Sequence, residues 1–207
     1  MLSFAVAPLA MRAAPIKMQE APVAPTLTPK QYAETLPGIA GPLGFFDPLD
    51  CTGAEGITEG KVRFYREVEL KHGRVAMLAA LGYPVAEQFH PLFGGSIDAP
   101  SFSAFQASPL QNLWPLVVFT ISVFEVFSVF TFEKPFVRDE EGKLGDLWSI
   151  PASHTAGDFG FDPLGLKPTN PAELKEMQTK ELNNGRLAMI AIAGMVAQEA
   201  ATGAKLF

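Results

Sequence analysis

The chain has 207 residues, of which 48% are hydrophobic and only 18% are charged, so it is long enough for one domain and strongly apolar. Its formal net charge of −6 leaves no basic surface that could neutralise a run of phosphates, which argues against a nucleic-acid partner. Cys51 is the single cysteine, so the sequence excludes a disulfide framework and a thiolate zinc site.

The amino-terminal part of the chain shows no helical pattern. Residues 1–20 are small, apolar and sparsely basic, which is typical of a targeting remnant. Four prolines follow between residues 22 and 37, and each fixes its own φ and lacks an amide donor, so we expect residues 21–60 to be extended. Residues 61–207 are expected to form the folded domain.

Three apolar stretches in that domain predict helices at about residues 61–90, 110–134 and 172–203. The middle stretch contains a twenty-residue apolar run with a single charge, Glu125, and a helix of that length matches a hydrocarbon core of about 30 Å. The apolar runs of the other two stretches are only twelve residues long. On hydropathy alone, a soluble helical bundle could bury them equally well.

The distribution of basic residues separates these two alternatives. No Lys or Arg occurs between Arg74 and Lys134, a gap that a water-exposed surface would rarely leave. The sequence therefore favours an all-α membrane protein with three transmembrane helices. Because basic residues precede the first apolar run and fill the second loop, the amino terminus and that loop are expected on the side from which insertion begins.

The first and third predicted helices contain an internal repeat. The nonapeptide ELKHGRVAM begins at Glu69 and ELNNGRLAM begins at Glu181, and the turns GFFDPLD at Gly44 and GFDPLGL at Gly160 precede them. Two copies of one motif on two helices predict a crossed pair related by a pseudo-twofold axis.

The repeat also predicts how the charges of the motif are neutralised. Glu69 and Arg74 lie about 140° apart around one helix, so they face different directions. In a symmetric crossing, Glu69 instead meets Arg186 while Arg74 meets Glu181, and two ion pairs neutralise four charges that would be costly in lipid. The glycine before each arginine would let the two backbones approach closely.

Three residues after each glutamate stands an oxygen or nitrogen donor, His72 in one helix and Asn184 in the other. Taken singly, His72 is more typical of a capped or solvated helix residue and Asn184 of a helix cap. Their repetition favours ligands instead. A magnesium ion already held by four ring nitrogens needs only one axial donor, whereas a dedicated metal cage needs several converging donors.

The motifs E-x-x-H-G-R-x-A-M and E-x-x-N-G-R-x-A-M on either side of a middle helix resemble the light-harvesting complex superfamily of chlorophyll-binding proteins, over about residues 43–203. The short carboxyl terminus after Thr202, the acidic middle helix and the HPLFGG segment resemble the fucoxanthin or peridinin chlorophyll a/c antennae of red-lineage algae. The resemblance implies a multi-pass protein of the plastid thylakoid membrane, with the amino terminus and the second loop in the stroma.

Carried over position by position, the resemblance implies chlorophyll ligands along all three helices. The implied magnesium ligands are Glu69, His72, Glu125, Glu181, Asn184 and Gln198. Gln88 and His90, near the end of the first helix, are weaker candidates. For Glu125 one alternative stays open, namely an acid that is hydrogen-bonded to a neighbouring helix.

The resemblance further implies two carotenoids whose end rings contact the turns before the crossed helices, at Phe46, Asp47, Pro48, Phe161, Asp162 and Pro163. Each aspartate is equally typical of an Asp-Pro turn cap. The implied pigments are chlorophyll a, chlorophyll c and a carotenoid of the fucoxanthin or peridinin type, with diadinoxanthin as a further candidate.

The function that follows is non-catalytic: an antenna that delivers excitation energy to a photosystem core, photosystem I rather than II, with other antenna subunits and thylakoid lipids as partners. A photoprotective quencher of the same superfamily would share all the ligands. A proton-coupled transporter using Glu69, His72 and Glu125 as relay groups is the alternative from another class. It is disfavoured, because every arginine of the motif has an acid to neutralise it and no catalytic motif accompanies these residues.

Overall fold

The computed structural model describes residues 27–41, 44–89, 92–129 and 148–206. Within those ranges the secondary structure is helical, apart from one isolated bridge between Ala40 and Gly44. The helices are α1 (Pro29–Thr35), α2 (Glu59–Gln88), the 3-10 turn η1 (Leu92–Gly95), α3 (Ser101–Ala107), α4 (Leu110–Val129) and α5 (Pro171–Thr202). The described residues agree with the all-α prediction.

The two longest helices, α2 and α5, have well-defined ends. The Thr58 hydroxyl caps α2 by accepting the Lys61 amide at 3.3 Å. Asn170 caps α5 in the same way, with a proline at the first helical position, and Gly203 ends α5 in the left-handed conformation at φ 63°. These are favoured residues for helix starts and stops, and the observed bounds lie within two residues of the predicted ones.

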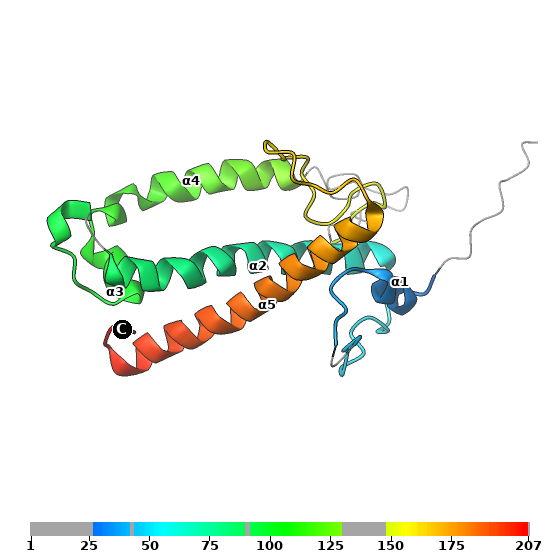
Figure 1. Cartoon of the computed structure of the whole chain (residues 1–207), viewed down its shortest axis with the longest axis horizontal. Coiled ribbons are helices and arrows are strands. Elements are labelled where there is room, and N and C mark those ends of the chain that lie inside the picture. The colour runs from blue at the N-terminus through cyan, green and yellow to red at the C-terminus, as the bar shows by residue number, and fades with distance from the viewer. Residues whose placement is uncertain (1–26, 42–43, 90–91, 130–147, 207) are drawn as a thin grey trace, which may run out of the picture.

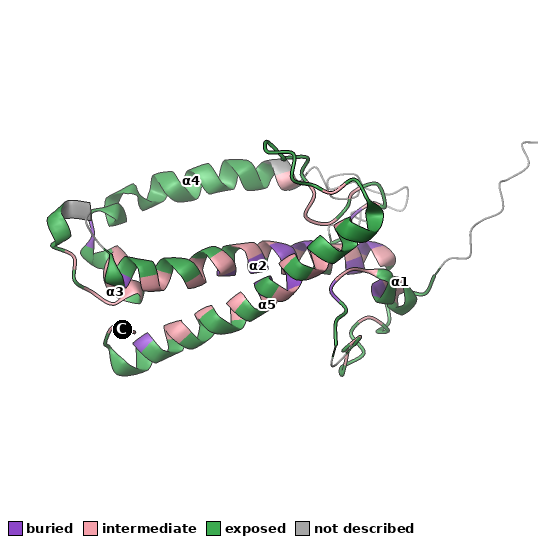
Figure 2. Ribbon diagram, in the orientation of Figure 1, coloured by how far each residue is buried: buried purple, intermediate pink, exposed green. Residues whose placement is uncertain are grey.

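Helices α2 and α5 cross each other, as Figure 1 shows. At the crossing Gly73 and Gly185 bring the backbones into contact, since a Cβ added to Gly73 would lie 3.1 Å from the Gly185 Cα. Leu70 and Leu182, at matching positions of the repeat, are buried beside them. Figure 2 places most of the buried residues of α2 around this crossing, so the protein's own packing is concentrated there.

Helix α4 runs alongside α2 without packing against it (Figure 1). Of the described helices, only α3 approaches the backbone of α4 closely, and the rings of Phe105 and Trp114 meet edge to face there at 4.9 Å. Nearly every side chain described on α4 is exposed (Figure 2). An apolar helix with no buried face of its own requires a covering that the described part of the chain does not supply.

The three-span prediction is not confirmed. Among the described residues, no single helix has the length and composition of a membrane span, and only the bent pair Ser101–Ala107 and Leu110–Val126, with 105° between its parts, meets that description. The amino-terminal halves of α2 and α5 contain many charged residues, which lowers the apolar character of both helices.

Two short helices correct the sequence-based predictions. Residues 21–60 were expected to be extended, yet they contain α1, which Thr28 and Gln31 begin with a capping box around Pro29. A proline in the first turn lacks only an amide that would be unpaired anyway, so Pro29 initiates this helix. Helix α3 was also not predicted. The targeting remnant at residues 1–20 and the last residues of the predicted middle helix, 130–134, lie outside the described residues.

The close approach of the helices predicts that Gly73→Ala destabilises the protein. The new methyl group would meet the Gly185 backbone, which cannot rotate away, so we expect a loss of about 1 to 3 kcal/mol. Thermal unfolding followed by circular dichroism measures it.

Gly82→Ala, in the same helix, is the matched control. A Cβ at Gly82 meets nothing within 4 Å, and alanine is favoured over glycine inside a helix by about 0.5 to 1 kcal/mol. Equal melting temperatures for the two variants would show that the crossing is not as tight as described.

Candidate functional site

Two ion pairs join α2 to α5 at their crossing. The Arg74 Nε donates to Glu181 Oε1 at 2.8 Å, and the Arg186 Nε donates to Glu69 Oε1 at 2.8 Å. These are the two pairs that the sequence repeat predicted. All four side chains are between 29% and 40% exposed, so the crossing neutralises its charges internally at a half-buried position.

Each arginine of the crossing also holds the loop before the other helix. The Arg74 Nη2 donates to the Gly157 carbonyl at 3.0 Å, and the Arg186 Nη1 donates to the Gly38 carbonyl at 2.7 Å. The amide of each glycine in turn donates to a side chain of the crossed helices, at 2.7 and 3.1 Å. Both glycines have φ near +77° to +99°, where a side chain would be strained.

The two glutamates of the repeat are not equivalent. The Arg66 Nη1 donates to Glu69 Oε2 at 3.1 Å, so both oxygens of Glu69 accept hydrogen bonds. Among the described residues, Glu181 accepts only through Oε1. The sequence analysis missed Arg66, although its place three residues before Glu69, on the same helix face, could have indicated it.

His72 and Asn184 are both exposed, at matching positions of α2 and α5. The His72 Nδ1 lies 2.8 Å from the Val68 carbonyl of its own helix. If Nδ1 carries the proton, that hydrogen bond orients the ring and leaves the Nε2 lone pair facing away from the helix, which is the usual arrangement of a metal-binding histidine. Val75 and Leu187, each three residues further on, are 67% and 66% exposed, so both donors border apolar surface.

Glu125 is engaged with α2. The Lys71 Nζ donates to Glu125 Oε2 at 2.7 Å and to the Ser128 hydroxyl at 3.1 Å. The open alternative for Glu125, an acid hydrogen-bonded to a neighbouring helix, is therefore what the structure contains. This bond does not exclude a ligand role, because only one of the two carboxylate oxygens takes part.

The structure says less about the predicted chlorophyll ligands near the carboxyl-terminal ends of α2 and α5. Gln198 and Gln88 are exposed, and no side-chain hydrogen bond fixes either amide in the described structure. His90 lies outside the described residues.

Sequence analysis missed the buried glutamates next to these two glutamines. Glu87 and Glu199 are 5% and 3% exposed. Glu87 accepts the amides of Ser101 and Leu206 at 3.4 and 2.9 Å, and Glu199 accepts the Phe102 amide at 2.8 Å. These hydrogen bonds connect α3 and the carboxyl terminus to the crossed helices. Their matching places in the two helices, eighteen residues after Glu69 and Glu181, were the available signal.

The aspartates of the two turns cap those turns. Asp47 accepts the amides of Cys51 and Thr52, both at 2.9 Å, and the Thr52 hydroxyl at 2.6 Å. Asp162 accepts the Lys167 amide at 2.9 Å and a second amide of its turn at 3.0 Å. These hydrogen bonds, led by the Thr52 hydroxyl and the Lys167 amide, hold the pKa of both carboxyls below the usual value. The turn-cap alternative describes both residues.

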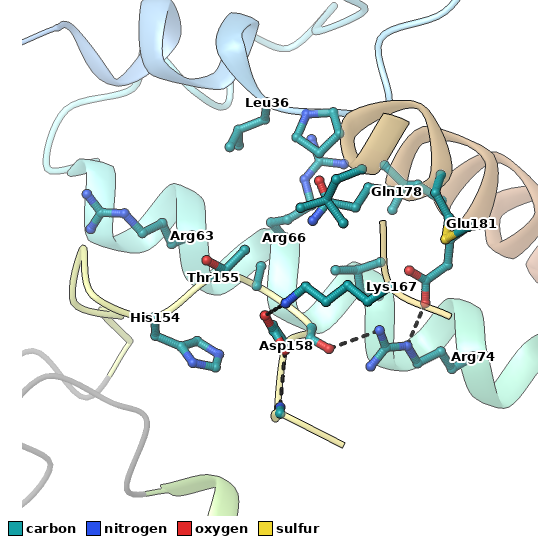
Figure 3. A pocket seen from close by; sticks show the side chains of 18 of the residues that line it. Leu36, Arg63, Arg66, Arg74, His154, Thr155, Asp158, Lys167, Gln178 and Glu181 are labelled. Atoms are coloured by element: carbon teal, nitrogen blue, oxygen red, sulfur yellow. Dashed lines mark hydrogen bonds and ion pairs between the residues drawn. The ribbon is translucent and has the colours of Figure 1, made fainter. Parts of the chain in front are cut away.

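Two pockets lie beside the crossing, each reaching one of these turns. The first, about 590 Å³, includes Phe161 and Asp162, and Figure 3 shows Arg66, Arg74 and Glu181 around it. The second, about 940 Å³, includes the matching Phe46 and Asp47 among its lining residues. The matching turns of the repeat therefore line two pockets beside the crossed helices.

The donor set fits a ligand that brings its own metal. Among the described residues, no three His, Cys, Asp or Glu side chains could together hold a metal ion. The exposed donors are instead single and spaced along helices, next to apolar side chains. That arrangement suits a flat apolar ring whose magnesium lacks one axial ligand.

Glu181→Ala should destabilise the crossing because it leaves Arg74 half-buried without its partner. As the two side chains are 32% and 38% exposed, the loss should be smaller than the about 3 to 5 kcal/mol of a fully buried pair. The measurement is thermal unfolding in detergent. Glu176→Ala is the control, because its ion pair with Lys180 within α5 is largely exposed and should matter little. Equal melting temperatures would contradict the crossed-pair arrangement.

Comparison with known proteins identifies the family of this chain. A family model described as chlorophyll A-B binding protein matches residues 32–200. The light-harvesting complex stress-related protein 3.2 of Chlamydomonas reinhardtii is 45% identical over 191 residues, covering 85% of this chain and 67% of that protein. The fucoxanthin-chlorophyll a-c binding protein of Isochrysis galbana is 42% identical over 194 residues, covering 88% and 87%.

A third relative is less similar. The chlorophyll a-b binding protein of Petunia hybrida is 31% identical over 189 residues, covering 86% of this chain and 65% of that protein. The resemblance drawn from the repeated motif is confirmed. The chain belongs to the chlorophyll A-B binding family of chloroplast light-harvesting proteins.

Proposed function

We propose that this protein is a light-harvesting antenna that holds chlorophyll and carotenoid in the thylakoid membrane and delivers excitation energy to a photosystem core. One observation carries the proposal. The crossing neutralises the charges of the repeated motif and leaves a neutral donor, His72 or Asn184, exposed on each helix. Bound pigments supply light absorption and excitation transfer, while the chain supplies their spacing and orientation.

The proposed chlorophyll ligands are those that the family resemblance implies. Glu181 keeps Oε2 for a magnesium, whereas Glu69 must use a remaining lone pair of an oxygen that already accepts a hydrogen bond. The other proposed ligands are His72, Asn184, Glu125, Gln198, Gln88 and His90. Chlorophyll a and chlorophyll c are the proposed types, in keeping with the name of the Isochrysis relative.

The two pockets beside the crossing are the proposed places for carotenoid end groups. Phe46 and Phe161 are 66% and 87% exposed at the turns that border them, and Pro48 and Pro163 stiffen the same turns. Because Asp47 and Asp162 are already engaged as caps, the carotenoid contacts would come mainly from the aromatic rings. A fucoxanthin-type carotenoid is favoured over a peridinin type by the names of several relatives.

We also propose the three-span arrangement in a thylakoid membrane, with α2, α4 and α5 crossing it. The exposed apolar side chains of α4 support this, and lipid and pigment would cover them. They include Leu113, Leu116, Phe119, Ile121 and Phe124. The gap in basic residues between Arg74 and Lys134 supports a stromal amino terminus and a stromal second loop.

Photoprotection is the second candidate function. It is favoured by the names of three relatives, all called light-harvesting complex stress-related proteins and 44–45% identical to this chain. The same ligands would serve both functions. Photosystem I is the proposed partner core for the antenna function, together with other antenna subunits. A proton-coupled transporter has no support from the family or from the neutralised crossing.

His72→Ala should remove about one chlorophyll per polypeptide after reconstitution with pigments, because one axial donor is lost while both ion pairs remain. Chlorophyll per polypeptide, measured after solvent extraction, is the readout. His72→Asn is the matched variant, since asparagine occupies the same place in α5, and it should retain the pigment. A full pigment complement in His72→Ala would contradict the ligand assignment.

The chlorophyll fluorescence lifetime of the reconstituted protein separates the two candidate functions. An antenna must keep excitation long enough to transfer it, so we expect a lifetime close to that of chlorophyll a in the same detergent. A much shorter lifetime at the same pigment content would overturn the antenna proposal in favour of photoprotection.

A further inference from the structure

Helix α4 has a single charged residue among Leu110–Val129, and that residue is held by another helix. Glu125 Oε2 accepts Lys71 Nζ of α2 at 2.7 Å. The Ser128 hydroxyl lies within hydrogen-bond distance of both groups, 3.1 Å from Lys71 Nζ and 3.3 Å from Glu125 Oε2. Lys71 Nζ also lies 5.9 Å from the centre of the Phe159 ring, within range of a cation–π contact.

This contact spans a gap between the two helices. In the described part of the chain the backbones of α2 and α4 do not approach each other. The Lys71 and Glu125 side chains are 31% and 57% exposed, so the protein's own packing does not bury the pair. The same helix also exposes large apolar side chains near Glu125 in the sequence, such as Ile121 and Phe124.

The carboxylate of Glu125 has one oxygen to spare. Among the described residues only Oε2 accepts side-chain hydrogen bonds, and Oε1 accepts none. A chlorophyll is neutral as a whole, so a carboxylate on its magnesium adds one negative charge, which is costly in an apolar surrounding unless a cation lies next to it. His72 and Asn184 are neutral donors and need no such cation.

The anionic ligands of the crossing follow the same rule. Glu69 and Glu181 each have an arginine from the opposite helix. Glu125 lies outside the repeat and has no arginine within its own helix. The Lys71 ammonium is the cation that the structure places on it.

We propose that Lys71 is a positioning residue for a chlorophyll ligated by Glu125, supplying the counter-charge from α2 so that this pigment lies between α2 and α4. The inference rests on the proposed pigment-binding function. It gives α4 a fixed place relative to the crossed pair, because the same lysine that neutralises the ligand also connects the two helices.

The test compares Lys71→Met, Lys71→Arg, Glu125→Gln and the double variant Lys71→Met with Glu125→Gln, each reconstituted with chlorophyll and carotenoid. Lys71→Met should lose about one chlorophyll per polypeptide, because the carboxylate is left without a cation. Glu125→Gln should keep this pigment, since an amide oxygen can bind magnesium without a counter-charge. The double variant should regain it, and Lys71→Arg should retain it.

Lys30→Met is the matched control, because it breaks an exposed ion pair between α1 and Asp50 that involves none of α2, α4 and α5, and it should leave the pigment count unchanged. Helix content from circular dichroism accompanies each count. Because the double variant contains no unpaired charge, its pigment count remains decisive even if Lys71→Met fails to fold.

Three outcomes separate a failure of the proposed function from a failure of the role of Lys71. If the unaltered protein binds no chlorophyll, the proposed function fails. If it binds chlorophyll and Lys71→Met keeps the full complement, only the role of Lys71 fails. A folded double variant that lacks the chlorophyll retained by Glu125→Gln would likewise overturn the counter-charge role, since removing the anion would then not compensate for removing the cation.

Discussion

The structure depends on one constraint: two carboxylates and two guanidinium groups must neutralise each other where α2 and α5 cross. The contact between Gly73 and Gly185 sets a backbone separation short enough for each arginine to reach the glutamate of the other helix. A wider crossing would leave four charges to be solvated separately, at a cost that apolar surroundings increase. Close backbone contact and charge neutrality are therefore one feature of this fold.

That neutral crossing also organises what surrounds it. Each arginine has spare N–H donors, and these hold the carbonyls of Gly38 and Gly157 in the loops before the helices. The loops in turn border the two pockets proposed for carotenoid end groups. Because the charges are satisfied inside the crossing, the outward faces of the helices can present neutral donors next to apolar surface.

The crossing could be predicted from the sequence because the same motif occurs in both helices. Two copies of the motif imply a pseudo-twofold pair, and the pair implies which glutamate meets which arginine. Other contacts were harder to predict. The Lys71 bond to Glu125 joins residues 54 apart that share no repeat. Glu87 and Glu199 do occupy matching places in the two helices, but they accept backbone amides, whose positions a residue pattern does not encode. Helix α1 was missed because a proline that starts a helix was interpreted as one that prevents it.

Helices α2 and α5 carry different residues at several matching positions of the repeat. Position 67 is glutamate in α2 and the matching position 179 is threonine in α5, while Lys71 of α2 matches Asn183 of α5. Glu67 accepts the amide of Gly157 in the second loop, and Lys71 reaches α4. Asn183 stays within its own helix, where its oxygen accepts from Arg186. Glu67 and Lys71 thus face elements outside the crossed pair, whereas Arg66, a third extra charge of α2, pairs with Glu69 within it. The charges that break the symmetry without entering the crossing are therefore the ones that hold the second loop and a third helix on one side only.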